Sequence, residues 1–240
     1  MIEAETSRAA RTLGIVGGIG PESTIAYYSQ IVAAYRARKP GAGYPSLILN
    51  SIDLDRMVQW FTAHDLDHVT EYLLQALRQL AAAGADFGII AANTPHLVFD
   101  DVQRRSPLPL ISIVEAACDA AERMALTRVG LLGTRFTMQS AFYSEVFARR
   151  GIAVVAPDAA DQEYIHAAYM NELIPGIFLP ATRARLVAII DRMKQATGIQ
   201  GAILGGTELP LILTDAAEAG IPLLDTTRIH VEQAVARLLE

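Results

Sequence analysis

The stretch GADFGIIAANTPH, residues 84–96, is the most informative part of the sequence for the fold. A glycine ends a helical segment, a continuous apolar run follows, and small polar residues then replace it, which is typical of a buried parallel strand and its carboxyl-end loop. The same layout returns in GIQGAILGGTELP, residues 198–210, and LGIVGG at 13–18 resembles VGLLGT at 129–134. These two pairs indicate two related α/β halves whose strand-end loops face each other across one cleft.

Outward from these strands, apolar runs alternate with helical periods along the chain. The predicted strands cover residues 13–16, 46–50, 87–91, 110–113, 128–132, 154–155, 202–204 and 222–224. The predicted helices cover residues 22–38, 65–83, 116–124, 138–150, 162–173, 182–196 and 229–239. This alternation predicts an α/β fold of two pseudo-symmetric domains with parallel sheets. We place 12–115 plus 222–240 in the first domain and 116–221 in the second.

Composition excludes several classes of protein. Of the 240 residues, 52 % are hydrophobic and 19 % charged, which argues against a disordered chain. The net charge of −6 comes without a basic run, so neither nucleic acid nor an anionic membrane surface is an expected partner. The single cysteine, Cys118, excludes an internal disulfide and favours a reducing cytoplasm. No apolar stretch reaches the roughly 18 residues of a membrane helix, and residues 1–11 are expected to be a frayed tail.

The chemistry is expected in the loops that follow the predicted strands, at residues 17–21, 50–56, 92–96, 133–137 and 205–208. These loops are rich in Gly, Thr, Asn and Ser, which suits a carboxylate held by backbone N–H groups and hydroxyls. Arg56 could take a second carboxylate bidentately. Neither a dinucleotide fingerprint nor a phosphate-binding Gly-Lys-Ser/Thr is present. A small anionic ligand is therefore predicted.

Each of these features also has a purely structural interpretation. The glycines could serve turns, Arg56 could pair at the surface, and Asn93 and Thr94 could cap a helix. His96 could be a buried structural histidine, and Glu208 an exposed acid at a helix start. Cys118, on an apolar helical face, is expected to be an inert core thiol.

Five segments together carry a family resemblance. They are LGIVGGIGPEST at 13–24, ANTPH at 92–96, GTRFTM at 133–138, GGTELPL at 205–211 and IPLLDTTRIH at 221–230. With these, the chain resembles the cofactor-independent aspartate/glutamate racemase family, which includes hydantoin racemases and arylmalonate decarboxylase. The resemblance runs from residue 13 to 239. It implies two pseudo-symmetric α/β domains with the active site between them, no pyridoxal cofactor, no metal, and a homodimer.

The chain departs from this family at two positions. Family racemases carry one cysteine before the Asn-Thr pair and another before Thr-Glu, and these two thiols exchange the α-proton on opposite faces. Here the positions hold Ala92 and Gly206, which cannot carry a proton. Cys118 lies outside both loops and cannot replace either.

The binding residues are retained by the same resemblance. The residues implied to hold the α-carboxylate and amino group are Asn93, Thr94, Thr134 and Thr207, and Gly18 and Thr137 are further expected substrate-binding residues. Arg56 matches an arginine that grips a distal carboxylate, but the lysine that some aspartate-specific members carry is replaced near Glu172 and Leu173. Aspartate is therefore in doubt as the ligand.

Three hypotheses follow. In the first, the chain is an enzyme with other chemistry, such as elimination, decarboxylation, hydrolysis or cyclisation, using Glu208 or His96 as base, with the Gly206 gap enlarging the site. In the second, it is an aspartate/glutamate racemase whose cysteines were replaced deliberately. In the third, it binds a small acid without catalysis.

Overall fold

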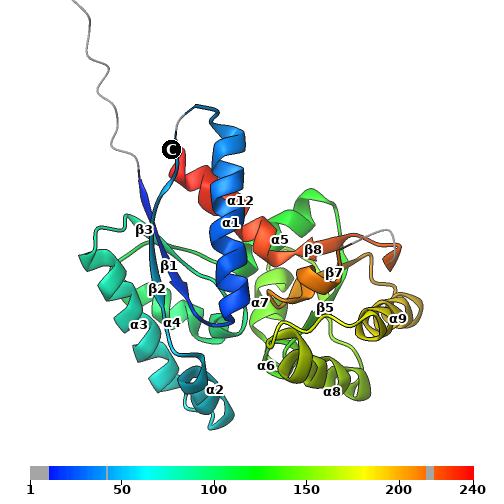
Figure 1. Cartoon of the computed structure of the whole chain (residues 1–240). Helices are drawn as coiled ribbons and strands as arrows, with labels where there is room; N and C mark the ends of the chain where they lie inside the picture. The colour runs from blue at the N-terminus through cyan, green and yellow to red at the C-terminus, as the bar shows by residue number, and fades with distance from the viewer. Residues whose placement is uncertain (1–10, 42, 215–218) are drawn as a thin grey trace, which may run out of the picture.

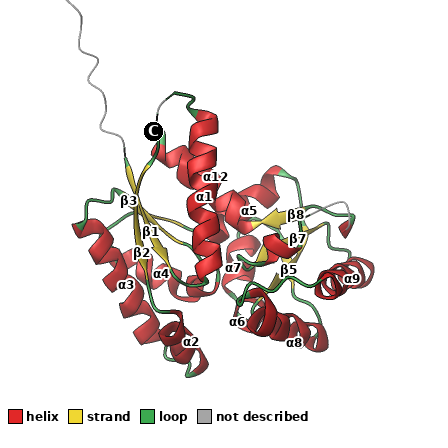
Figure 2. Cartoon of the chain, in the orientation of Figure 1, coloured by secondary structure: helices red, strands yellow, loops and turns green. Residues whose placement is uncertain are grey.

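The computed structural model describes residues 11–41, 43–214 and 219–240. The tail expected at residues 1–11 lies outside the described residues except for Arg11, as do residues 215–218 of the expected second domain. Two lobes stand side by side, each with a sheet covered by helices, and α12 (Thr226–Leu238) runs between them (Figure 1 and Figure 2).

The two sheets have the same construction. The described residues form two four-stranded parallel sheets, in the orders β2-β1-β3-β4 and β6-β5-β7-β8. The strands are β1 Thr12–Gly17, β2 Ser46–Ser51, β3 Phe87–Ile90, β4 Leu110–Ile111, β5 Arg128–Gly133, β6 Ala153–Val155, β7 Gly201–Gly205 and β8 Leu223–Asp225. Central strands β1 and β3 correspond to β5 and β7, which are the pairs that the sequence repeats indicated. The α/β prediction is confirmed.

Helices cover both faces of each sheet. They are α1 Pro21–Arg38, α2 Leu54–Thr62, α3 Leu66–Ala82, α4 Phe99–Arg105, α5 Ile113–Arg123, α6 Arg135–Gln139, α7 Phe142–Ala148, α8 Ala159–Ala168, α9 Pro180–Thr197, α10 Leu209–Ile212 and α12. A 3₁₀ turn, η1 Thr94–Val98, follows β3, and a π-helical turn, η2 Tyr169–Leu173, continues α8. Side chains alternate between the faces: Leu13 and Ile15 pack against α1 and α12, whereas Val16 packs against α2 and α3.

The chain returns to the first lobe later than residue 222, the boundary placed from sequence. Strand β8 still pairs with β7, so residues 223–225 belong to the second sheet. Only α12, which begins after the capping residue Asp225, packs into the core of the first lobe through Val231 and Val235. The same helix also contacts the second lobe through Ile229, so it joins both cores.

Three helix predictions need correction. The helix expected at 138–150 is two helices, because the backbone is extended at Ser140 between α6 and α7. The helix expected at 162–173 ends in the π-helical turn η2. Helix α2 was not predicted: it begins within the expected loop 50–56, where the Asp53 side chain accepts the backbone N–H groups of Asp55 and Arg56, and continues to Thr62. In the described part of the chain, no helix has the length and apolarity needed to cross a bilayer.

Candidate active site

A small cavity of about 90 Å³ lies where the carboxyl ends of the two sheets meet. Its polar lining comes from both lobes and consists of Asn93, Thr94, Thr134, His166, Tyr169, Thr207 and Glu208. Its apolar wall includes Leu54, Met57, Val58, Phe61, Phe136, Met170 and Ile174. Ala92 and Gly206, the residues at the expected cysteine positions, both border it. The structure thus brings the strand-end loops of 92–96 and 205–208 together around one cavity.

Three threonine hydroxyls join the lobes at the edge of this cavity. Thr94 of the first lobe lies 3.2 Å from Thr134 and 3.2 Å from Thr137, and these two are also 3.2 Å apart (Oγ1 to Oγ1). Thr134 caps α6, since its Oγ1 accepts the Thr137 N–H. Each hydroxyl can rotate to donate or accept, so the cluster can present donors to an anion without moving the backbone.

Asn93 is fixed by the second lobe. Its Oδ1 accepts the Tyr143 hydroxyl at 2.6 Å, and its Nδ2 donates to Thr226 Oγ1 at 3.2 Å. Thr226 in turn donates to the Leu204 carbonyl. Asn93 is 3 % exposed, so both ends of its amide are engaged in holding the loop after β3 against the second lobe. The structure gives this residue a positioning role beside the cavity.

Glu208 points into the cavity and is buried. It is 4 % exposed, and its Oε2 accepts the Thr207 hydroxyl at 3.1 Å. A Cβ atom at Gly20 would overlap its Oε1, so the loop after β1 leaves room for this carboxylate only because residue 20 is glycine. Burial raises the pKa of Glu208, while the hydrogen bond from Thr207 opposes that rise. The exposed helix-start interpretation is wrong, and a carboxylate with a raised pKa suits proton transfer.

The space beside Gly206 is filled. A Cβ atom at this position would overlap the hydroxyl oxygen of Tyr169 and would lie 2.5 Å from its Cζ atom. Tyr169 is 1 % exposed and comes from the π-helical turn η2. The Gly206 gap therefore does not enlarge the site, because the phenol occupies the place that a larger side chain would take.

His96 does not border the cavity. Its Nδ1 lies 3.0 Å from the Ala92 carbonyl oxygen, its Nε2 accepts the Ile113 N–H at 3.2 Å, and its ring stacks on Phe99. Burial lowers the pKa of His96 to about 3, so the ring is neutral at ordinary pH. Both nitrogens are engaged with backbone, which matches the structural interpretation of this residue.

Besides Thr137, which contacts Thr94 and Thr134 without lining the cavity, two further predicted binding residues lie away from the lining. The Arg56 side chain is 63 % exposed, and its Nε is 3.7 Å from Asp53 on the outer side of α2. Gly18 has a positive φ of 84°, and its N–H donates to Thr24 Oγ1 at 2.9 Å. A side chain at 18 would collide with the Ile52 backbone, so this glycine serves the tight turn. Cys118 is fully buried on α5, and burial raises its pKa to about 11.

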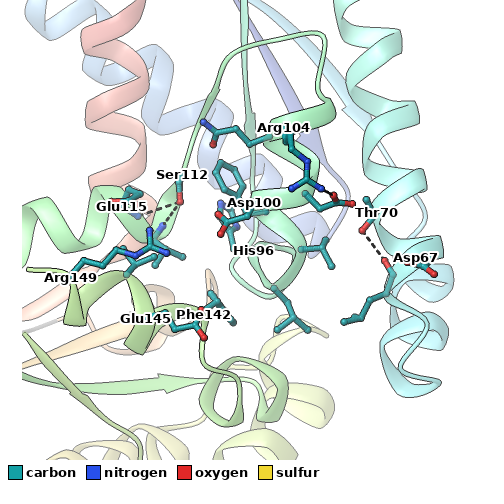
Figure 3. A pocket seen from close by; sticks show the side chains of 18 residues that line it. Asp67, Thr70, His96, Asp100, Arg104, Ser112, Glu115, Phe142, Glu145 and Arg149 are labelled. Atoms are coloured by element: carbon teal, nitrogen blue, oxygen red, sulfur yellow. Dashed lines mark hydrogen bonds and ion pairs between the residues drawn. The ribbon is translucent and has the colours of Figure 1, made fainter.

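A larger hollow of about 750 Å³ opens elsewhere, between α3, α4, α5 and α7 (Figure 3). Its lining contains five acids and two arginines, namely Asp67, Asp100, Asp101, Glu115, Glu145, Arg104 and Arg149, and Figure 3 labels all of them except Asp101. The excess of carboxylates disfavours an anionic ligand, and none of the strand-end threonines lines this hollow. The smaller cavity is therefore the candidate active site.

Sequence reasoning missed two parts of the cavity. The apolar wall formed by α2 could have been predicted from the sequence, because Leu54, Met57 and Phe61 recur at helical spacing after the capping residue Asp53. No sequence pattern predicts the place of Tyr169, because its position depends on the π-helical turn and on contact with a loop far along the chain.

Comparisons with known proteins agree with this geometry. A family model described as Asp/Glu/Hydantoin racemase matches residues 16–234. A curated relative, the broad specificity amino-acid racemase of Bacillus subtilis, is 26 % identical over 237 residues, which is 95 % of this chain and 98 % of the relative. A Yersinia pestis protein assigned as an Asp/Glu racemase has a TM-score of 0.87 at 34 % identity, with 96 % of this chain and 100 % of that chain covered. An aspartate racemase homologue from Pyrococcus horikoshii OT3 has a TM-score of 0.83 at 33 % identity, with the same coverage.

Proposed function

Because the chain belongs to the Asp/Glu/hydantoin racemase family, we propose that it binds a small carboxylic or amino acid between its two sheets and transforms it without thiol racemisation. The proposed base is Glu208. The observation that carries this proposal is the buried Glu208 carboxylate beside a cavity whose two expected cysteine positions hold Ala92 and Gly206. Glu208 can then carry a proton to or from one face of the ligand, whereas Ala92 and Gly206 supply no thiol on either face.

The lining favours a ligand with one carboxylate and an apolar remainder. Hydroxyls of Thr94 and Thr134 supply donors, and aliphatic and aromatic side chains make up the apolar part of the lining. Among the described residues that line the cavity there is neither Lys nor Arg. A second carboxylate such as that of aspartate would be desolvated there without a cation, which is costly.

The chemistry follows from the state of Glu208. As a carboxylate it can take a proton from the α-carbon, becoming the neutral acid while the electron pair moves into the ligand carboxylate as an enediolate. Hydroxyl donors beside the ligand carboxylate would stabilise that charge. Loss of a β-substituent with its bonding electron pair from that enediolate completes an elimination. In a decarboxylation Glu208 would instead start as the neutral acid: CO₂ leaves from a second carboxyl group on the α-carbon, the electron pair of the broken bond forms the enediolate on the remaining carboxylate, and Glu208 then protonates the α-carbon.

Deliberate replacement of two cysteines, the alternative racemase hypothesis, fits the cavity less well. A cysteine shortened to glycine would leave an empty space, whereas here Tyr169 occupies it. This packing supports glycine as the natural residue at position 206.

The test is a turnover survey by NMR with small acids that carry an amino, hydroxyl or second carboxyl group at the α-carbon. We expect conversion of at least one to a product that is not its mirror image, and a loss of about 10²–10⁴-fold in kcat for Glu208→Gln. Glu122→Gln, which changes an exposed acid on α5, is the matched control and should retain activity. Turnover that survives Glu208→Gln would contradict the assignment, and ligand binding without any turnover would favour the non-catalytic hypothesis.

The family resemblance also supports a homodimer in the cytoplasm. Large apolar side chains are exposed on α1 and around β2, namely Ile25, Tyr28, Tyr44 and Leu49, and could form such a contact. Light scattering after size exclusion should give twice the mass of the 25.9 kDa chain, and a monomer mass would contradict the dimer.

A further inference from the structure

The hydroxyl of Tyr169 is a buried polar group without a protein partner. The residue is 1 % exposed, and its oxygen accepts or donates no hydrogen bond within the described residues. Buried hydroxyls in native proteins nearly always have a partner, so an orphan at a cavity wall points to a group that arrives from outside the chain. Tyr169 does border the candidate cavity.

The chemistry of this hydroxyl indicates which kind of hydrogen-bond partner would bind to it from outside the chain. Burial and the nearby Glu208 carboxylate raise the pKa of Tyr169 well above its ordinary value, so the phenol stays protonated. A neutral phenol is a hydrogen-bond donor, and the natural acceptor in a cavity of this kind is a carboxylate oxygen. Tyr169 forms no hydrogen bond of normal geometry in the described part of the chain, although it lies close enough to Glu208 for the phenol and the carboxylate to affect each other's pKa.

The backbone that carries Tyr169 is unusual. The residue opens the π-helical turn η2 at the end of α8, and such turns occur frequently at functional sites. The phenol also occupies the space in front of Gly206, so it limits the length of any ligand on that side. The same ring is placed both to donate to a ligand and to restrict its size.

We infer that Tyr169 is a ligand-contacting and specificity-determining residue, whose hydroxyl donates a hydrogen bond to the carboxylate of a small acid and whose ring excludes longer acids. This inference rests on the proposed function for the class of ligand, but not on the identity of the reaction or the role of Glu208. In this arrangement Tyr169 fills the volume that a side chain at position 206 would otherwise occupy.

The test uses propionate labelled with ¹³C at the carboxyl group, titrated by NMR, and thermal unfolding of the same proteins. Tyr169→Phe should weaken propionate binding by about tenfold to a hundredfold. The same variant should raise the unfolding midpoint of the ligand-free protein by roughly 2–4 °C, because it removes an unpartnered buried hydroxyl. A merely structural tyrosine would not move these two readouts in opposite directions.

Size selection is tested with Tyr169→Ala and the series acetate, propionate, butyrate and valerate. We expect the preferred chain length to increase in this variant. Tyr164→Phe is the matched control, because it removes a hydroxyl from half-buried Tyr164 of α8, which does not line the cavity, and should change neither binding nor size preference.

The possible outcomes distinguish a failure of the proposed ligand class from a failure of the role given to Tyr169. If the unaltered protein binds none of these acids, the proposed ligand class fails and this inference fails with it. If it binds them and Tyr169→Phe binds equally well, the inference alone is overturned. Loss of thermal stability in Tyr169→Phe with unchanged binding would likewise show that the hydroxyl serves the fold.

Discussion

The loops after β3 and β7 share a sequence layout but have opposite arrangements. Each offers one titratable side chain, His96 in the first and Glu208 in the second. His96 turns back under its own loop, where Ala92 and Ile113 occupy both ring nitrogens. Glu208 crosses to the other lobe and packs against Gly20. The repeated layout therefore predicts that two loops lie at equivalent strand ends, but Glu208 corresponds to Thr94 in the repeat and not to His96, so the layout does not predict equivalent side chains.

The difference has a local cause in the residues that surround each position. The pocket around His96 supplies backbone partners and the Phe99 ring, which stabilise a neutral imidazole. The pocket around Glu208 supplies the Thr207 hydroxyl and an apolar wall, which leave a carboxylate only partly compensated. The first arrangement is a satisfied buried histidine, and the second leaves a buried carboxylate with a raised pKa, which we propose as the base.

The largest effect is expected from placing thiols at both family cysteine positions, 92 and 206. Ala92→Cys with Gly206→Cys should give no racemisation, since Tyr169 leaves no room for the second sulfur. Adding Tyr169→Ala should raise racemisation of an amino acid at least about a hundredfold over the double variant, the gain expected when a positioned base is supplied. Polarimetry on enantiopure alanine and glutamate measures this. Equal racemisation by the double and triple variants would contradict the role given to the phenol.

A second prediction concerns the histidine side of the comparison. His96→Phe keeps the stack on Phe99 but leaves the Ala92 carbonyl and the Ile113 N–H unpaired. We expect the free energy of unfolding to fall by about 2–4 kcal/mol, measured by urea titration, while the folded protein keeps its activity. Activity lost at unchanged stability would instead make His96 catalytic.

A third prediction tests whether Tyr169 and a side chain at position 206 compete for the same space. Gly206→Cys should lower the free energy of unfolding by about 1–3 kcal/mol through overpacking. In a Tyr169→Ala background the same substitution should cost much less, so a double-mutant cycle on chemical denaturation should give a clear coupling. Additive effects would mean that the two positions do not compete for space.

The smallest effect is the pH dependence that Glu208 imposes. Its pKa is raised in the folded protein above its ordinary value of 4.5, so the folded state holds the proton more tightly than the unfolded state. The free energy of unfolding should therefore fall as pH rises from 4.5 through the raised pKa, and activity should rise in that window as the base ionises. Urea titrations of the unaltered protein and Glu208→Gln over this range isolate the effect, since only the variant lacks the group. Parallel stability curves would contradict a raised pKa.

The sequence was sufficient for the parts of the molecule that depend on local pattern. Apolar runs and glycines located the strands and the loops that end them, and the threonines of those loops do meet at the cavity. Contacts between distant segments were not readable: Asn93 with Tyr143, Glu208 against Gly20, and Tyr169 in front of Gly206. Each depends on how the lobes face each other, and the π-helical turn that aims Tyr169 has no sequence signal in a stretch that otherwise reads as helix.

The most direct test of the central claim is the stereochemical course of reaction in heavy water. An enantiopure acid that the protein accepts is incubated in D₂O, and recovered substrate is examined for deuterium at the α-carbon and for its mirror image. With Glu208 acting on one face, deuterium should enter with the configuration retained, and Glu208→Gln should stop the exchange. Deuterium uptake accompanied by equal formation of the opposite enantiomer would require a second proton carrier on the far face and would contradict the account.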